Sequence, residues 1–262
     1  MPEKQGRAVL HIAGAARFIS DLHLNAARAD IAARFFAFLA DTAKAKVSAL
    51  FILGDLFDAW IGDDDLTDPF NTQVCTRLRQ LADSGTQVFF MAGNRDFLIG
   101  DSFAAASGVH RLDEPQKVGA GLNPFLDDTA ILLLHGDTLC TDDVDYQRFR
   151  QLVRSGAWQA DFLARPLAER RAEAQALRQR SRLATQAKAE DIMDVNAGSV
   201  RAALAAAACH LLIHGHTHRP GCERITLADG IAERWVLSDW DTGRGDALEV
   251  NADGIRRIDL SS

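Results

Sequence analysis

The chain has 262 residues, of which 47% are hydrophobic and 25% are charged, which is typical of a globular protein with a substantial core. Its formal net charge of -7 argues against a protein that holds nucleic acid through phosphate contacts. The four cysteines (Cys75, Cys140, Cys209 and Cys222) form no C-x-x-C pair, so we expect reduced thiols in a cytoplasmic protein.

The first half of the chain alternates between predicted strands and predicted helices. Short apolar runs at 17–20 and 49–53 predict strands, and apolar residues spaced three to four apart predict a helix at 29–45 between them. A second helix is expected at 69–85 and a third strand at 87–92. This alternation favours parallel strands covered by helices, which is the α/β fold class.

The second half changes character. Two further strands are expected at 130–134 and 210–213, with a long helical region between them. Four successive strands without helices follow, for which we expect antiparallel pairing: 222–227, 233–240, 246–251 and 255–260. The sequence shows no internal repeat or linker, so we predict one domain, residues 1–262, with a helical insert at about 145–208.

Each of the five earlier predicted strands ends in a residue type that binds metal ions. In chain order these residues are Asp21 and His23, Asp55, Asn94, His135, and His216 and His218. Ligands bind at the carboxyl ends of strands in open α/β sheets, so these side chains are expected to converge. Nitrogen and oxygen donors of this kind suit Mn²⁺, Fe²⁺ or Zn²⁺.

Seven ligands suit two ions rather than one, and Asp55 is the natural bridge. We assign Asp21, His23 and His218 to one ion, and Asn94, His135 and His216 to the other. Two such ions, about 3.5–4 Å apart, form a hydrolytic device that acts on phosphorus centres.

These motifs resemble those of the calcineurin-like metallophosphoesterases. The strings "GDLFDAWIGDDD", "GNRDFLIG", "HGDTLCTDD", "IMDVN" and "IHGHTHRP" further resemble the UDP-2,3-diacylglucosamine pyrophosphatases of lipid A synthesis, roughly over residues 18–240. The resemblance implies a four-layer α/β/β/α sandwich with a helical insert, and two divalent ions, Mn²⁺ above all. It also implies that a hydroxide activated by the two ions hydrolyses UDP-2,3-diacylglucosamine to UMP and 2,3-diacylglucosamine 1-phosphate. A peripheral protein on the cytoplasmic face of the inner membrane is implied as well.

The same resemblance implies roles for individual residues. The implied substrate contacts are Asn94, Arg95, Asp143, Ser181, Thr185, Lys188 and His216, and the implied catalytic residues are Asp55, Asn94, Arg95 and His135. Thr185 stands where the family usually has Asn, so this contact loses the donor and acceptor sites of an amide. The segment 238–245 departs from the family pattern, and no role is carried over to it.

Arg95 stands where many relatives have His. A guanidinium keeps its proton at physiological pH and cannot serve as a general acid. A phosphate leaving group, whose second pKa is about 6, needs charge stabilisation rather than a proton. We therefore expect Arg95 to stabilise a departing phosphate, and the alternative is an ion pair with Asp96 or Asp58.

Three other groups allow more than one interpretation. Asp63, Asp64 and Asp65 lack the spacing of a calcium loop, so a solvated acidic turn is expected. Trp60 and Phe57 are expected to be packing residues rather than substrate contacts. Asp58 and Asp137 either orient ligand histidines through hydrogen bonds or are plain surface carboxylates.

The segment 158–188 holds six Arg and one Lys against three acids, a balance of +4 within a chain of -7. Its first part is apolar and includes Trp158 and Phe162. One interpretation is a solvated helix with an ordinary core stripe. The other is a lid that shelters acyl chains, whose basic face (Arg170, Arg171 and Arg178) meets an anionic membrane.

Two alternatives to the lipid pyrophosphatase remain at this point. One is a dinuclear metallophosphoesterase that acts on nucleotides or phosphoproteins. The other is a binding scaffold without catalysis, which would predict missing metal ligands. The sequence points to UDP-2,3-diacylglucosamine and a membrane surface as partners, with no nucleic acid and no obligate protein partner.

Overall fold

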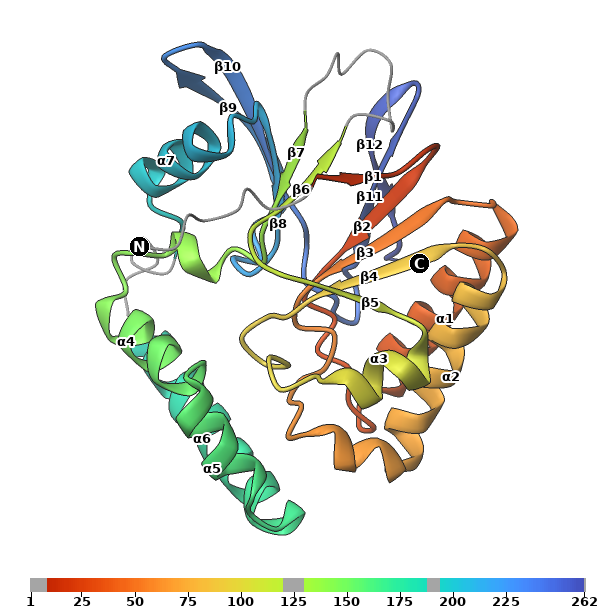
Figure 1. Ribbon diagram of the computed structural model, residues 1–262, viewed down its shortest axis with the longest axis vertical. Coiled ribbons are helices and arrows are strands. Elements are labelled where there is room, and N and C mark those ends of the chain that lie inside the picture. Colours follow the sequence, from red (N-terminus) through yellow and green to blue (C-terminus); the bar gives the residue numbers. More distant parts are fainter. Residues whose placement is uncertain (1–8, 120–129, 188–193, 262) are drawn as a thin grey trace.

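The computed structural model describes residues 9–119, 130–187 and 194–261, with backbone only at 181–187 (Figure 1). One six-stranded sheet runs in the order β1 (Leu10–His11), β6 (Gln116–Gly119), β7 (Ile131–Leu133), β8 (Leu211–His214), β10 (Gly230–Val236), β9 (Gly221–Leu227). The other runs β12 (Gly254–Asp259), β11 (Asp246–Asn251), β2 (Ala16–Ile19), β3 (Ala49–Leu53), β4 (Gln87–Met91), β5 (His110–Leu112). The described helices are α1 (Ala29–Lys44), α2 (Pro69–Asp83), α3 (Asp101–Ser107), α4 (Val144–Val153), α5 (Gly156–Leu163), α6 (Leu167–Ala187) and α7 (Ala197–Ala207).

The two sheets pack face to face, and their inner faces form one apolar core. Phe18, Phe51 and Phe89 stand side by side on β2, β3 and β4, with successive ring centroids 4.9 Å apart, and they share a cluster with Ile131 and Ile213 of the other sheet. Strands buried on both faces read as continuous apolar runs. This burial explains the unbroken apolar runs of the sequence.

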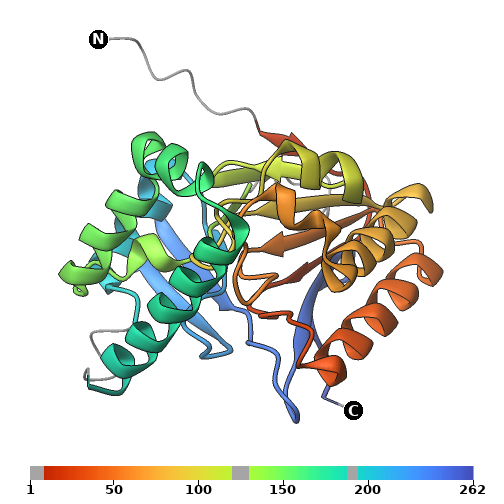
Figure 2. The same cartoon turned by 90° about the horizontal axis from the view of Figure 1, so that it is seen from below.

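Helices cover both outer faces, so the predicted four-layer sandwich is confirmed (Figures 1 and 2). Alternate residues of β2, β3 and β4, such as Ile52 and Phe90, pack against α1, α2 and α3. On the opposite outer face, Leu204 of α7 packs against Leu212 of β8. Since side chains alternate along a strand, each central strand serves two apolar layers at once.

The strand directions agree with the sequence prediction in all but one pairing. β2, β3 and β4 are parallel, while β9 pairs with β10 and β11 pairs with β12 in antiparallel hairpins. β10 and β11 lie in different sheets, so the antiparallel pairing expected between these two successive strands is wrong. β10 instead pairs with β8 in parallel, and β11 pairs with β2.

α4, α5 and α6 lie together, apart from the helices that cover the sheets (Figures 1 and 2). Arg170 of α6 fastens this group to the sandwich. It is 2% exposed, donates to the carbonyls of Ile61 (2.6 Å) and Arg165 (2.9 Å), and pairs with Asp64 in the acidic turn. A buried guanidinium needs such partners, because its desolvation is costly without them.

Two more arginines of α6 pair with carboxylates of the sandwich. Arg171 pairs with Asp65, and Arg178 pairs with Asp58. The acidic turn is solvated at Asp64, which is 54% exposed, but Asp65 is 13% exposed, and both carboxylates hold the insert in place. Arg170 and Arg178 turn their charges to the protein, so the expected lipid-facing basic face is wrong for these two, while Arg171 remains 51% exposed beside Asp65.

Among the described residues, no helix is both long and apolar enough to cross a bilayer.

Candidate metal centre and the cavities beside it

The loops after β2 and β3 run side by side and carry three of the predicted ligands. The Asp21 backbone N–H donates to the Gly54 carbonyl (3.1 Å), and the His23 N–H donates to the Asp55 carbonyl (2.9 Å). β2 and β3 are parallel neighbours, so their carboxyl ends and the loops that follow meet at one edge. This pairing fixes Asp21, His23 and Asp55 next to one another.

Asp55 lies between two groups of imidazoles. Its Oδ1 is 3.8 Å from His135 Nε2, and its Oδ2 is 3.8 Å from His23 Nδ1. On the His23 side, His218 Nε2 lies 3.4 Å from both His23 Nε2 and Asp21 Oδ1. The two oxygens of Asp55 thus face different groups, as a bridging carboxylate requires.

Asn94 belongs to the second group of imidazoles, that of His135 and His216. Its Oδ1 lies 3.1 Å from His135 Nε2 and 3.1 Å from His216 Nδ1. The structure therefore brings all seven residues predicted as metal ligands together. One detail differs from the predicted division of the ligands between two ions. Ligand atoms of Asp21, Asp55 and His135, which were assigned to different ions, also lie within 4.8 Å of one another.

Five of these seven residues have left-handed backbone conformations. Their φ angles are 56° for Asp21, 50° for His23, 54° for Asp55, 70° for His216 and 55° for His218. Each such conformation costs of order 1–3 kcal/mol for a residue with a Cβ and persists only where surrounding structure enforces it. Such strain concentrates at functional sites.

Glycines precede several of these ligands because the loops approach one another closely. A Cβ on Gly54 would lie 2.4 Å from His135 Nδ1, and a Cβ on Gly215 would lie 2.3 Å from Asp21 Oδ2. Both contacts are shorter than atoms tolerate. The G-D and G-H pairs of the sequence therefore reflect the packing of one ligand against another.

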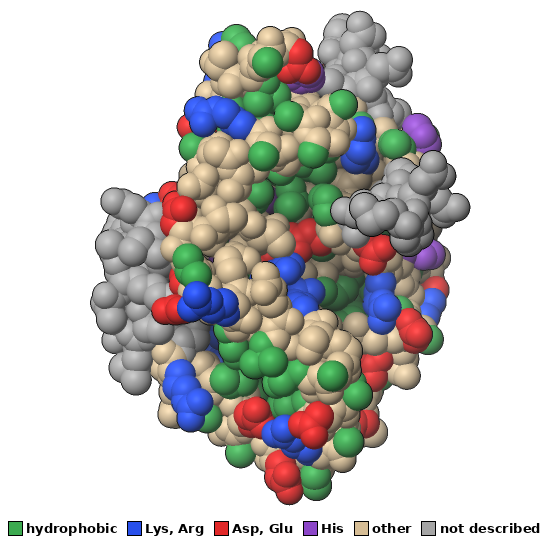
Figure 3. All heavy atoms as spheres, turned by 60° about the vertical axis from the view of Figure 1, so that its left-hand side comes forward, with side chains coloured by type: hydrophobic (Ala, Val, Ile, Leu, Met, Phe, Trp, Pro, Cys, Tyr) green, Lys and Arg blue, Asp and Glu red, His purple; other side chains and the backbone are tan. Residues whose placement is uncertain are grey.

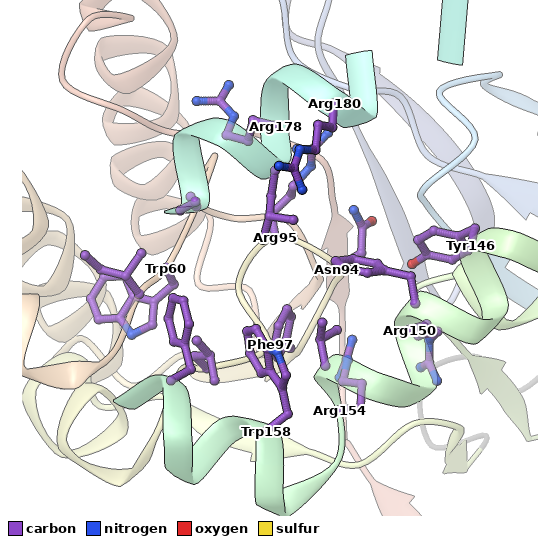
Figure 4. Close-up of a pocket in the computed structure, with 18 of the residues that line it drawn as sticks. Trp60, Asn94, Arg95, Phe97, Tyr146, Arg150, Arg154, Trp158, Arg178 and Arg180 are labelled. Atoms are coloured by element: carbon purple, nitrogen blue, oxygen red, sulfur yellow. The ribbon is translucent and has the colours of Figure 1, made fainter. Parts of the chain in front are cut away.

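A cavity of about 480 Å³ opens beside this cluster, between the sandwich and α4–α6 (Figures 3 and 4). We call it the aromatic cavity, because Trp60, Phe97 and Trp158 are among the residues that line it. Figure 4 shows Phe97 and Trp158 on one side and Arg95, Arg178 and Arg180 on the opposite side. Figure 3 shows basic side chains around a hollow on the face that carries the insert. The cavity thus offers apolar walls to one part of a ligand and positive charge to another.

Trp60 serves both packing and the cavity. It is 3% exposed, and the centroid of its ring lies 4.7 Å from that of Phe57 and 5.1 Å from that of Phe103. It also lines the aromatic cavity. The prediction of a packing role is confirmed for Trp60 and Phe57. The place of Trp60 in the cavity wall was not foreseen.

A calcineurin-like phosphoesterase family model matches residues 17–220, which include all the predicted ligands. The chain belongs to this family. It is 50% identical over 226 residues to a UDP-2,3-diacylglucosamine hydrolase of Aromatoleum aromaticum, covering 86% of this chain and 89% of the relative.

Proteins named UDP-2,3-diacylglucosamine hydrolase from Chromohalobacter salexigens and Cellvibrio japonicus are 45% and 47% identical to it. They cover 92% and 91% of the chain, and 94% and 95% of their own lengths. At these identities the chain belongs, within the calcineurin-like phosphoesterases, to the group that carries this name.

The residues of this phosphoesterase fit a metal centre on structural grounds. His23 Nδ1 is buried, and no described residue forms a hydrogen bond with it. An unpaired buried polar atom is costly, and a metal ion would satisfy it. The donor set of carboxylate, amide and imidazole suits a divalent first-row ion.

Burial sets the charge of the ligands. It lowers the pKa of His23 to about 3 and that of His216 to about 4, so both are neutral at pH 7, as metal ligands must be. Burial also raises the pKa of Asp55 to about 7. For His135 burial would lower the pKa, but Asp55 and Asp21 outweigh it and raise the pKa to about 9.

We expect metal affinity to increase with pH. Asp55 and His135 must lose their protons to act as ligands, and their pKa values of about 7 and about 9 mean that both hold protons at pH 6. Affinity for Mn²⁺ should therefore rise from pH 6 to about 9 with release of protons. Calorimetric titration in buffers of different ionisation enthalpy measures both effects. A pH-independent affinity with no proton release would contradict this account, and His135→Ala should remove the upper part of the dependence.

Sequence reasoning missed Asp96, which holds two ligand loops together. Its fully buried carboxylate accepts hydrogen bonds from the backbone N–H groups of Gly93 (2.8 Å), Leu56 (2.7 Å) and Asp55 (3.3 Å). It therefore fixes the ends of β3 and β4 relative to each other. Its position two residues after Asn94 gave no sign of this role.

Sequence reasoning also missed the polar face of α4. Arg150 pairs with Asp137 (2.7 Å) and Glu114 (3.0 Å), and Tyr146 donates to Asp137 (2.7 Å). Arg154 donates to the Gly93 carbonyl (2.8 Å). Tyr146, Arg150 and Arg154 are spaced four apart, a pattern that places them on one helix face and that could have signalled this role.

The interpretation of Asp58 and Asp137 as surface carboxylates is wrong. Asp137 is fully buried and Asp58 is 8% exposed. Asp137 accepts from Tyr146 and Arg150 of α4, while Asp58 accepts from Asn25 and pairs with Arg178. These contacts tie the insert to the metal-binding loops.

The predicted substrate contacts fall into two sets. Asn94, Arg95 and Asp143 line the aromatic cavity, and His216 lies in the metal cluster beside it. Ser181 and Thr185 belong to the part of α6 for which only the backbone is described, and Lys188 lies outside the described residues. Arg95 Nε is buried, and no described residue forms a hydrogen bond with it.

Proposed function

We propose that the protein hydrolyses the pyrophosphate bond of UDP-2,3-diacylglucosamine, giving UMP and 2,3-diacylglucosamine 1-phosphate. The observation that carries this proposal is an aromatic cavity beside a cluster of metal-binding side chains, with Arg95 where the two meet. The names of relatives at 45–50% identity support the same substrate. Release of UMP from this substrate with added Mn²⁺, and its loss with a chelator, tests the proposal.

The roles of the chain's own residues follow from their positions. Asp21, His23 and His218 would hold one ion, Asn94, His135 and His216 the other, and Asp55 both; Mn²⁺ is the ion we favour. When bound, two such ions supply positive charge at the scissile phosphate and activate water for attack. Asp96, through its backbone hydrogen bonds, keeps the loops of Asp55 and Asn94 in register.

Arg95 would bind the departing phosphate. Its guanidinium lines the cavity next to the cluster, and its backbone N–H donates to Asp55 Oδ1 (2.8 Å), which fixes its loop. A planar guanidinium suits bidentate contact with phosphate oxygens. Arg95 thereby stabilises charge without transferring a proton.

In this proposal residues 1–262 form one domain, and α4–α6 form a lid over the acyl chains. Trp158 stacks on Phe162 with centroids 4.8 Å apart, and both line the cavity. Trp158→Ala or Phe162→Ala should raise KM for long-chain substrate about tenfold or more, since each ring contributes about 1.5–3 kcal/mol of burial. KM for a short-chain analogue should change little.

Leu163→Ala is the matched control for this lid prediction. It removes an apolar side chain from the same helix, but Leu163 is 41% exposed and does not line the cavity. Steady-state kinetics in detergent with both substrates provide the comparison. Equal losses on long-chain and short-chain substrates in Trp158→Ala would assign this ring to packing alone.

We further propose that α4 rests on the inner membrane from the cytoplasmic side, where a diacylated substrate resides. Three large hydrophobic side chains of α4 are exposed: Val144, Phe149 and Leu152. Exposed apolar side chains on an amphipathic helix favour the bilayer interface. This surface takes the place of the basic face that the sequence suggested.

Leu152→Glu should therefore weaken binding to vesicles that contain anionic phospholipid, by about tenfold for the loss of one buried leucine. Ile231→Glu is the control, because Ile231 is similarly exposed (55% against 57%) but lies on β10. Vesicle sedimentation measures the effect. If both variants bind vesicles like the wild type, α4 does not rest on the membrane.

A further inference from the structure

A second cavity, of about 470 Å³, lies beside the same metal cluster. His23 and His218 form part of its wall, together with Arg28 and Asp241. It therefore reaches the predicted metal ligands from the loops after β2 and β10. It is distinct in character from the aromatic cavity, since three carboxylates (Asp58, Asp239 and Asp241) and three guanidiniums (Arg28, Arg95 and Arg178) line it.

The two cavities adjoin at the cluster. Asp58, Arg95 and Arg178 line both of them. A molecule held at the metal cluster can therefore extend into the aromatic cavity on one side and into the polar cavity on the other. Arg95 lies where such a molecule would cross from one cavity to the other.

We propose that the polar cavity binds the nucleoside half of a nucleoside diphosphate lipid, and UMP after hydrolysis. This inference rests on the proposed function. A pyrophosphate bond at the cluster separates an acylated sugar from a ribose and a pyrimidine base. The aromatic walls suit the acyl chains, and the polar cavity is left for the other half.

The chemistry of the polar walls fits a nucleoside. Carboxylates accept hydrogen bonds from ribose hydroxyls, and guanidinium N–H groups donate to the carbonyl oxygens of uracil. Arg28 is held toward this cavity by Asp241 (2.6 Å) and lies 3.4 Å from Asp30. With five N–H donors, it can contact a base while keeping these partners. Trp240 also lines this cavity.

Two alanines allow each cavity to be filled without removing a contact. Ala27 is exposed and lines the polar cavity, while Ala59 is exposed and lines the aromatic cavity. Ala27→Trp and Ala59→Trp are thus matched variants that add the same bulk on opposite sides of the cluster. Because neither alanine is buried, both variants should fold and bind Mn²⁺ like the wild type.

The test measures the affinity of the Mn²⁺-loaded proteins for UMP, inorganic phosphate and 2,3-diacylglucosamine 1-phosphate by calorimetry. In the wild type, UMP should bind about tenfold more tightly than phosphate, and Ala27→Trp should reduce UMP to the affinity of phosphate. Affinity for the lipid product should stay unchanged in Ala27→Trp and fall in Ala59→Trp.

Failure of this inference can be distinguished from failure of the proposed function. If the wild type hydrolyses UDP-2,3-diacylglucosamine but Ala27→Trp binds UMP as tightly as the wild type, the nucleoside lies elsewhere and the inference is overturned. If the wild type does not hydrolyse this lipid, the proposed function fails. The affinity for UMP then still decides the inference. A loss of UMP affinity in Ala27→Trp but not in Ala59→Trp supports it, and a wild type that binds UMP no more tightly than phosphate overturns it.

Discussion

Asp55→Ala should abolish hydrolysis and empty both metal positions. The two oxygens of Asp55 face His135 and His23, one in each predicted ligand group. Removing a residue on which a whole catalytic unit depends lowers kcat by about 10⁴-fold or more. We expect kcat/KM to fall by at least that factor, and metal analysis should find less than one equivalent of Mn²⁺ per chain.

The control for this variant is the stability of the metal-free protein. Burial raises the pKa of Asp55 and so opposes its ionisation, but Asp55 Oδ1 also accepts a hydrogen bond from the Arg95 backbone N–H, so its removal should lower the melting temperature only modestly and leave the metal-free protein folded. A folded variant without metal would thus separate ligand loss from misfolding. Two ions still bound in Asp55→Ala would contradict the bridging role.

Arg95→Ala should lower kcat/KM by about 10²–10³-fold, the loss that follows removal of one transition-state donor. The side chain lines the aromatic cavity beside the metal ligands, and its Nε has no hydrogen-bond partner among the described residues. The metal ligands are untouched, so metal content should remain at the wild-type value. Pre-steady-state and steady-state rates of UMP release measure the loss.

Two replacements at this position separate charge from proton transfer. Arg95→Lys keeps the charge but not the planar pair of donors, so it should restore only part of the rate. Arg95→His should not recover activity at low pH, because a phosphate leaving group needs no proton. A bell-shaped recovery near pH 6 in Arg95→His would show that a general acid is required after all.

The fold and the ligand set could be predicted because their signals are local. Apolar runs that end in Asp21, Asp55 or His135 mark buried strands and their carboxyl ends, and parallel pairing brings those ends to one edge. The close approach of these loops is visible in the sequence as well, because glycines such as Gly54 occupy positions where a Cβ would collide with a neighbouring ligand.

Contacts of the insert could not be predicted, because they depend on which side chains meet across the chain. Arg170 and Asp64 are 106 positions apart, and each looks like an ordinary surface charge in its own segment. The sequence shows the charge of a helix but not which face it buries. For this reason a basic surface was expected where the structure has an anchored helix.

The central claim is that this phosphoesterase prefers a nucleoside diphosphate lipid. The measurement that tests it most directly compares kcat/KM of the Mn²⁺-loaded protein for UDP-2,3-diacylglucosamine and for a soluble phosphomonoester such as p-nitrophenyl phosphate. We predict a preference for the lipid of about 10³-fold or more, because binding of the acyl chains contributes to the transition state. Equal values, or a preference for the phosphomonoester, would contradict the claim and favour a phosphoesterase acting on nucleotides or phosphoproteins.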